Sequence, residues 1–81
     1  MLKIYGMMIC PDCVECCEAL DKANIPYEFL DFSRETTNLK EFLKIRDNSE
    51  LFDKAREEGN IGIPCIVKED GNVTLNWEEF M

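Results

Sequence analysis

The spacing of apolar residues changes along this chain, and each spacing predicts a different element. Leu2–Tyr5 is a short apolar run typical of a strand, and Gly6–Ile9 then forms a loop. Apolar residues recur every three or four positions over Pro11–Ala23, which predicts a helix. Tyr27–Phe32 is rich in aromatic residues and largely alternates, so it is predicted to be a second strand. The predicted inner face of the helix carries Cys13, Cys16, Cys17, Leu20 and Ala23.

The middle of the chain is predicted to form two helical segments. Ser33–Thr37 is a polar turn, and Asn38 with Glu41 three residues later is a capping pair, so the first piece is expected to begin at Asn38. Its apolar stripe consists of Leu39, Phe42 and Leu43. A polar break at Asp47-Asn48-Ser49 precedes the second piece, which Gly59 closes.

The last third of the chain predicts a hairpin. Ile63–Val67 is expected to be the third strand, and Asp70-Gly71 is a strong turn before a fourth strand at Val73–Leu75. Trp77–Met81 has room for one or two helical turns. The order β-α-β-α-α-β-β-α, with a right-handed crossover between the first two strands, predicts that they run parallel. We therefore expect one α/β domain, residues 1–81, with a four-stranded mixed sheet flanked by helices.

Length and charge limit the function classes. An 81-residue chain can bury one core, and no stretch approaches the roughly 20 apolar residues that a membrane span needs. The first residues are too soon interrupted for a signal peptide, so a cytoplasmic protein is expected. The net charge of -8 disfavours nucleic-acid binding, and the absence of histidine excludes histidine-based catalysis or metal ligation.

The cysteines carry the candidate chemistry. Their number, 5, is odd, and four of them gather at Cys10, Cys13, Cys16 and Cys17. Without a secretory signal this pattern favours a catalytic or metal-binding cluster in a reducing compartment over a disulfide scaffold. Cys10-Pro11-Asp12-Cys13 stands at the head of the first predicted helix, where the helix dipole favours a thiolate and Pro11 suits the first turn. Asp12 opposes that thiolate electrostatically.

Several of these features together resemble the glutaredoxin family of the thioredoxin-fold superfamily. They are Ile4-Tyr5 ending the first strand, the Cys10-Pro11-Asp12-Cys13 motif, Ile63-Pro64 opening the third strand, and the Asp70-Gly71 hairpin. Within that family the chain is most similar to short bacterial glutaredoxin-related proteins. The resemblance implies a glutaredoxin-like fold and a thiol–disulfide oxidoreductase that serves electron transport in cell redox homeostasis.

By this resemblance each site residue receives a role. Cys10 would attack a substrate disulfide, and Cys13 would resolve the mixed disulfide. Pro64 would be a cis proline, and Ile63 would offer its backbone to an extended substrate. The residues expected to bind substrate are Pro11, Asp12, Ile63, Pro64, Met7 and Trp77. The partners would be a disulfide-containing protein or a glutathione mixed disulfide.

The resemblance leaves the reductant and glutathione open. Met7 stands where the family usually has a lysine, and Asn76-Trp77 stands where it usually has two glycines. Trp77 would either fill the core at the end of the sheet or close over the substrate groove. A basic residue of the middle helices could replace the missing lysine, the candidates being Lys44, Arg46, Lys54 and Arg56. No permanently bound cofactor is expected, and glutathione, a flavoprotein reductase or another protein would restore the dithiol.

Two other interpretations stay open. Cys10, Cys13, Cys16 and Cys17 could hold an iron–sulfur cluster or metal, which would make the chain a carrier. The chain could also be a binding module that captures a partner without catalytic cycling. Taken singly, Cys16, Cys17 and Cys65 are expected to fill the core, as free cysteine often does. The apolar loop Met7-Met8-Ile9 would either turn inward or expose a docking surface for a protein.

Overall fold

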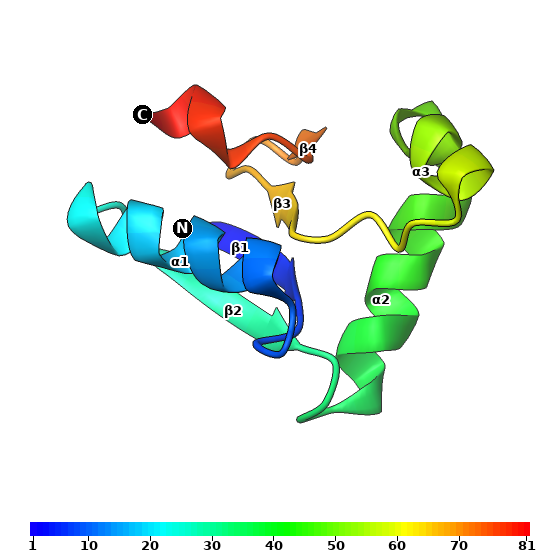
Figure 1. Ribbon diagram of the computed structural model, residues 1–81, viewed down its shortest axis with the longest axis horizontal. Coiled ribbons are helices and arrows are strands. Elements are labelled where there is room, and N and C mark those ends of the chain that lie inside the picture. Colours follow the sequence, from blue (N-terminus) through cyan, green and yellow to red (C-terminus); the bar gives the residue numbers. More distant parts are fainter.

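The computed structural model describes residues 1–81 as an α/β domain (Figure 1). Its regular elements are β1 (Leu2–Gly6), α1 (Pro11–Lys22), β2 (Tyr27–Asp31), α2 (Thr36–Asp47), α3 (Asp53–Glu58), β3 (Cys65–Val67) and β4 (Val73–Thr74). Short 3₁₀ turns lie at Glu50–Phe52, before α3, and at Trp77–Phe80, after β4. None of the helices is both long enough and apolar enough to cross a membrane.

The four strands form one mixed sheet in the order β2-β1-β3-β4. β1 and β2 are parallel, with Leu2 opposite Tyr27, which confirms the predicted crossover through α1. β3 runs antiparallel to β1, with Cys65 opposite Tyr5, and β4 pairs antiparallel with β3. The predicted α/β class, mixed sheet and hairpin are therefore confirmed. The central position of β1 and β3 brings the loop after β1 beside the segment that enters β3.

Alternation along the strands sends side chains to two separate cores. One face of the sheet packs under α1 and the final 3₁₀ turn, and its buried residues are Leu2, Ile4, Cys16, Leu20 and Ile66. The opposite face packs against α2 and the turn before α3, and its buried residues are Tyr5, Phe32, Phe42, Phe52 and Cys65. Figure 1 shows α1 and α2 separated by the sheet. Ala23, predicted to belong to the inner face of the first helix, is instead its exposed C-cap.

The ends of β1, α1 and β2 differ by one residue from the sequence predictions, and three further boundaries also differ. α2 begins at Thr36 rather than Asn38, because the Asn38 amide donates a hydrogen bond (3.0 Å) to the carbonyl of Asp31 and does not cap the helix. β3 begins at Cys65 rather than Ile63, since Pro64 has no N–H with which to extend the ladder. β4 is correspondingly short and ends at Thr74. Gly59 closes α3 with a left-handed φ of 75°, as predicted.

Candidate functional site

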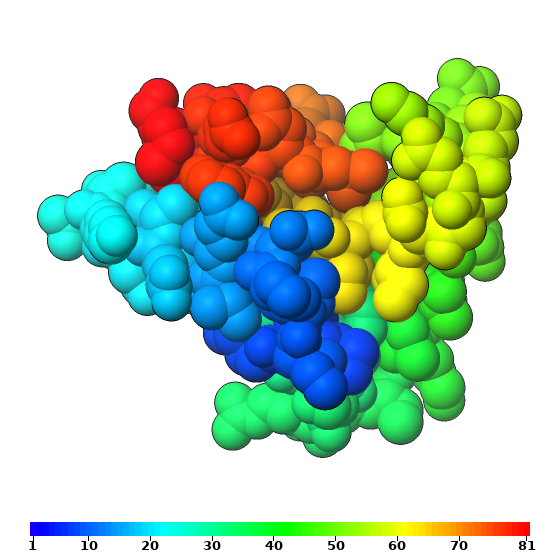
Figure 2. Space-filling view, viewed as in Figure 1, coloured from blue at the N-terminus to red at the C-terminus, as the bar shows by residue number.

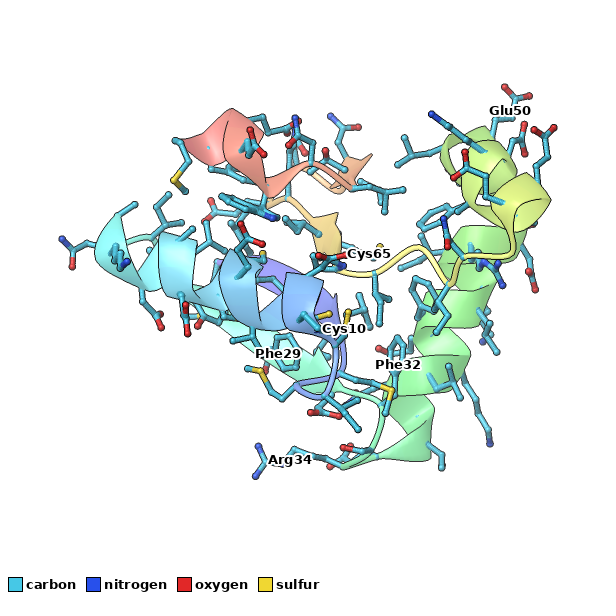
Figure 3. The ribbon with its side chains drawn as sticks, viewed as in Figure 1. Cys10, Phe29, Phe32, Arg34, Glu50 and Cys65 are labelled. Atoms are coloured by element: carbon cyan, nitrogen blue, oxygen red, sulfur yellow. The ribbon has the colours of Figure 1, made fainter.

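Cys10 occupies the N-cap of α1, at the head of the helix (Figure 3). Its backbone is extended, with φ -82° and ψ 120°, and Pro11 follows in the first turn. The Cys10 carbonyl accepts hydrogen bonds from the backbone N–H groups of Cys13 (3.1 Å) and Val14 (3.2 Å). The helix dipole therefore points its positive end at Cys10. The Cys10 side chain is partly exposed, whereas Cys13, one turn further, is 0% exposed.

Cys13 is enclosed between α1 and the end of β1. A Cβ atom placed on Gly6 would lie 2.6 Å from the Cys13 sulfur, so the backbone of Gly6 and this sulfur are in direct contact. Burial raises the pKa of the Cys13 thiol to about 12; a hydrogen bond from the Met7 backbone acts in the opposite direction, and the Cys10 sulfur adds to the rise. At neutral pH Cys13 is therefore a protonated thiol that solvent cannot reach.

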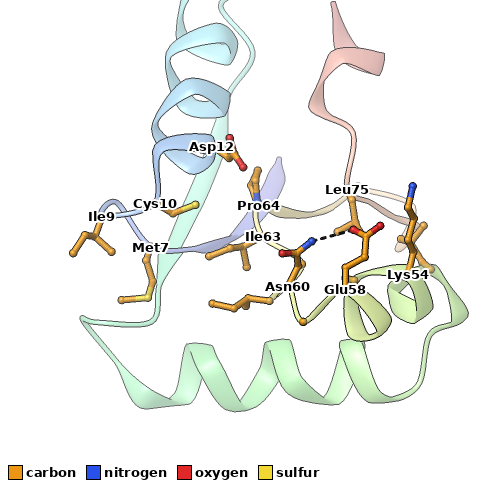
Figure 4. Close-up of a pocket in the computed structure, with 15 residues that line it drawn as sticks. Met7, Ile9, Cys10, Asp12, Lys54, Glu58, Asn60, Ile63, Pro64 and Leu75 are labelled. Carbon is orange, nitrogen blue, oxygen red and sulfur yellow. Dashed lines mark hydrogen bonds between the residues drawn. The ribbon is translucent and has the colours of Figure 1, made fainter.

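A groove of about 760 Å³ opens beside Cys10. One wall is the loop before α1 and the first turn of that helix, and the other is α3 with residues 59–64. Figure 4 shows the Cys10 side chain directed across the groove toward Pro64, with Leu75 and Lys54 at the far end. In the space-filling view the blue segment around Cys10 and the yellow segment before β3 border the same recess (Figure 2).

The structure brings together most of the predicted site residues. Met7, Asp12, Ile63 and Pro64 all line the groove with Cys10. The Ile63–Pro64 peptide bond is cis, as the resemblance implied. Of the four basic candidates, Lys54 is the one that lines the groove.

Two predicted residues lie elsewhere. Trp77 packs against the core under α1, among Leu2, Cys16 and Leu20, so the core interpretation of Trp77 holds and its place in the substrate-binding set is corrected. A short final turn directs it there, because the Asn76 side chain accepts a hydrogen bond (3.1 Å) from the Glu78 N–H and caps that turn. Pro11 is exposed in the first turn of α1 and does not line the groove.

The remaining cysteines belong to the cores. Cys16 and Cys65 are both 0% exposed, and they lie on opposite faces of the sheet. Burial raises the pKa of each of these two thiols to about 12, and it also raises the pKa of Cys17. Nowhere in the chain do three or more cysteine or carboxylate side chains gather in a geometry that could hold a metal ion. Core filling, predicted for these three cysteines, is confirmed.

Sequence reasoning missed three contributors to the site. Gly6 leaves room for the Cys13 sulfur. The position of this glycine, between the first strand and the loop before the cysteine pair, was the sequence feature that could have indicated the contact. Asp31 ends β2, and its signal was an acid at the end of an aromatic strand, directly before the polar turn. The far wall had no local signal, because its residues come from the 3₁₀ turn before α3, from α3, from the following loop and from the residue after β4. They are Leu51, Ala55, Glu58, Asn60, Ile61 and Leu75.

Asp31 ties the loop before Cys10 to the sheet. Its carboxylate, 6% exposed, accepts hydrogen bonds from the Ser33 N–H (2.7 Å), the Ser33 hydroxyl (2.6 Å) and the Met8 N–H (3.3 Å). The hydrogen bond from the Ser33 hydroxyl is the largest cause that lowers the pKa of Asp31 below its ordinary value. The same carboxylate thus anchors the turn after β2 and the loop that carries Cys10.

We expect Asp31→Asn to lower the free energy of unfolding by about 2 kcal/mol at pH 7, because charged acceptors make the stronger hydrogen bonds. A lowered folded-state pKa means that the ionised Asp31 stabilises the fold above about pH 4 and loses this effect as the pH falls through the folded-state value. Urea unfolding at pH 7 and pH 3.5 should therefore show a smaller difference between variant and wild type at the lower pH. The control is Asp47→Asn, which replaces an exposed carboxylate at the end of α2. It should change the free energy of unfolding by less than about 0.5 kcal/mol.

Comparison with known proteins gives one relative. The chain is 33% identical over 67 residues to an uncharacterized protein of Haemophilus influenzae, a match that covers 83% of this chain and 78% of that protein. The chain belongs to that protein's family. Neither a family model nor a solved structure matches the chain. Because this relative is uncharacterized, the groove and its cysteines are the features that bear on function.

Proposed function

We propose that this chain is a glutaredoxin-like thiol–disulfide oxidoreductase with a thioredoxin-like fold, in which Cys10 and Cys13 form the redox pair. One observation carries the proposal: a partly exposed cysteine at a helix N-terminus opens onto a groove, and a second cysteine lies fully buried one turn behind it. The mixed sheet with helices on both faces is compatible with this fold. We further propose that the protein works in the cytoplasm, where thiols are kept reduced.

The proposed reaction begins at Cys10. Its thiolate attacks one sulfur of a substrate disulfide; the substrate S–S bond breaks, one half leaves as a thiolate that takes up a proton, and the other half stays bound to Cys10. Cys13 then loses its proton and attacks the Cys10 sulfur, which releases the second substrate thiol. Two electrons and two protons have passed to the substrate, and a Cys10–Cys13 disulfide remains. A low-molecular-weight thiol or a dithiol protein restores the pair by the reverse exchange.

Burial determines the order of the two attacks. Cys10 faces the groove, whereas Cys13 is 0% exposed and its pKa is raised to about 12. An intermolecular disulfide can therefore approach Cys10 and cannot approach Cys13. Once Cys10 carries the substrate, the nearby Cys13 needs only an intramolecular step, which proximity favours strongly. This arrangement prevents the two thiols from competing for the first attack.

Oxidation of the wild-type chain tests the proposal. After anaerobic purification the protein should contain no stoichiometric iron or zinc, and mild oxidation should lower its mass by two hydrogens, reversibly. Stoichiometric metal that depends on Cys16 would instead support the carrier interpretation. Stable capture of a disulfide partner without release would support a binding module that does not cycle.

A further inference from the structure

The groove beside Cys10 has an apolar surface that is open to solvent. Ile9 is 84% exposed on the rim next to Cys10, and Ile61 (53%) and Leu51 (44%) are exposed on the opposite wall. Between them lie Met7, Ile63 and Leu75, which are partly buried. The groove is therefore bordered by exposed aliphatic side chains on both walls, an arrangement that marks binding surfaces for apolar groups.

Charge is distributed unevenly along the groove. Asp12 lies at the Cys10 end, and its carboxylate makes no side-chain hydrogen bond or ion pair within the chain. Lys54 and Glu58 lie together at the far end, where their opposite charges balance (Figure 4). The reacting sulfur therefore has one uncompensated negative charge beside it, in a protein whose net charge is -8. A positive charge next to the partner's disulfide would meet Asp12 favourably.

The wall opposite Cys10 also has free backbone groups. Residues 61–63 lie outside every strand and contribute to none of the backbone hydrogen bonds of the loops. These three residues line the groove between the end of α3 and Pro64. Extended polypeptide can pair with such an edge through its main chain, while its side chains enter the neighbouring apolar positions.

We propose, on the basis of the function proposed above, that the redox partner is an extended polypeptide segment with an aliphatic residue on one side of its half-cystine and lysine or arginine on the other. The aliphatic residue contacts Ile61 and Leu51, and the cation faces Asp12. Glutathione fits this groove less well, because it carries two carboxylates and no aliphatic side chain, while Asp12 repels anions at the sulfur. Exchange follows the reaction above, with the partner's disulfide as the electron acceptor and the two partner thiols as products.

Capped tripeptide disulfides test this proposal directly. Three probes have cysteine in the centre, flanked by leucine and lysine, by serine and lysine, or by leucine and glutamate; glutathione disulfide is the fourth. The rate at which each oxidises the reduced wild-type chain is divided by its rate with dithiothreitol, which removes differences in intrinsic disulfide reactivity. We expect the leucine–lysine probe to react about tenfold faster than glutathione disulfide, with the other two probes between them.

Two variants test which residues cause the preferences for lysine and for leucine in the probes. Asp12→Asn should reduce the lysine-over-glutamate preference about threefold, and the ratio cancels any general change in the reactivity of Cys10. Ile61→Ser should reduce the leucine-over-serine preference about threefold to fivefold, because about half of that side chain is open to a partner. Glu18→Gln on α1 and Leu39→Ser on α2 remove matched exposed groups outside the groove and should leave both ratios unchanged.

The outcomes separate the two proposals. If glutathione disulfide reacts as fast as the leucine–lysine probe, or if neither variant changes its ratio while exchange continues, the partner assignment is overturned and the oxidoreductase function stands. If each of the four disulfides reacts no faster with the chain than with dithiothreitol, both proposals are overturned.

Discussion

Cys10→Ser is expected to abolish thiol–disulfide exchange, with the rate falling to that of the reagents without protein. Serine cannot form the mixed disulfide, and the other thiols cannot replace Cys10, because Cys13, Cys16 and Cys65 are 0% exposed and Cys17 is 4% exposed. Reduction of a small aromatic disulfide, followed by the colour of the released thiolate, measures the rate without assuming any natural partner. Persistent exchange in this variant would show that another cysteine is the nucleophile.

Cys13→Ser is the matched variant, and it should fail at a different step. Cys10 would still attack, but no internal thiol would release it, so the chain should accumulate as a stoichiometric mixed disulfide that intact mass detects. Cys16→Ala serves as the control, since Cys16 lies in the core under α1 and does not line the groove. This control should retain the exchange rate of the wild type even where its stability is lower.

Gly62→Ala should destabilise the fold by roughly 2 to 5 kcal/mol, a large share of the about 4 to 12 kcal/mol expected for a domain of this size. Gly62 has a φ of 93°, which alanine adopts only with strain. An added Cβ would also lie 2.7 Å and 2.9 Å from two ring atoms of Phe52. That ring is 0% exposed and packs edge-on against Phe42, with a centroid distance of 5.8 Å, so it cannot move aside cheaply.

Gly71→Ala separates the two causes. Gly71 has a similar φ of 88°, but an added Cβ there would meet no atom within 4 Å. This control should lose only the conformational contribution, about 1 to 2 kcal/mol. Urea unfolding of both variants at pH 7 measures the difference, which reports the contact with Phe52. Equal losses in the two variants would show that Gly62 is required for its backbone conformation alone.

Local pattern predicted most of the fold because the decisive signals are short-range. A short apolar run identified β1, alternation identified β2, and Asp70-Gly71 placed the hairpin, since each signal depends on a few consecutive residues. The capping pair at Asn38 was wrong because a tertiary contact, the hydrogen bond from its amide to the Asp31 carbonyl, competes with the cap. β3 was overextended because an apolar run does not show where the ladder ends.

The near half of the candidate site was predictable, and the far half was not. Cys10 and Cys13 are only three positions apart in the sequence, and Pro64 was placed beside them through a family resemblance. Leu51, Ile61 and Leu75 reach the groove only because the 3₁₀ turn before α3, the loop after α3 and the residue after β4 meet in three dimensions, and their local sequence does not indicate that contact. The position of Trp77 along the chain left both the core and the groove open, and the final turn directs it into the core under α1.

A redox titration with peptide mapping tests the central claim most directly. The wild-type chain is equilibrated in a series of glutathione redox buffers, blocked by alkylation, weighed intact and then digested. Recognition of glutathione is unnecessary here, because the equilibrium does not depend on the rate of approach. We predict the loss of two hydrogens at a single midpoint, with the disulfide mapped to Cys10 and Cys13 and the thiols of Cys16, Cys17 and Cys65 still free. An unchanged mass throughout the series, or a disulfide that involves any of those three cysteines in place of the Cys10–Cys13 pair, would contradict the account.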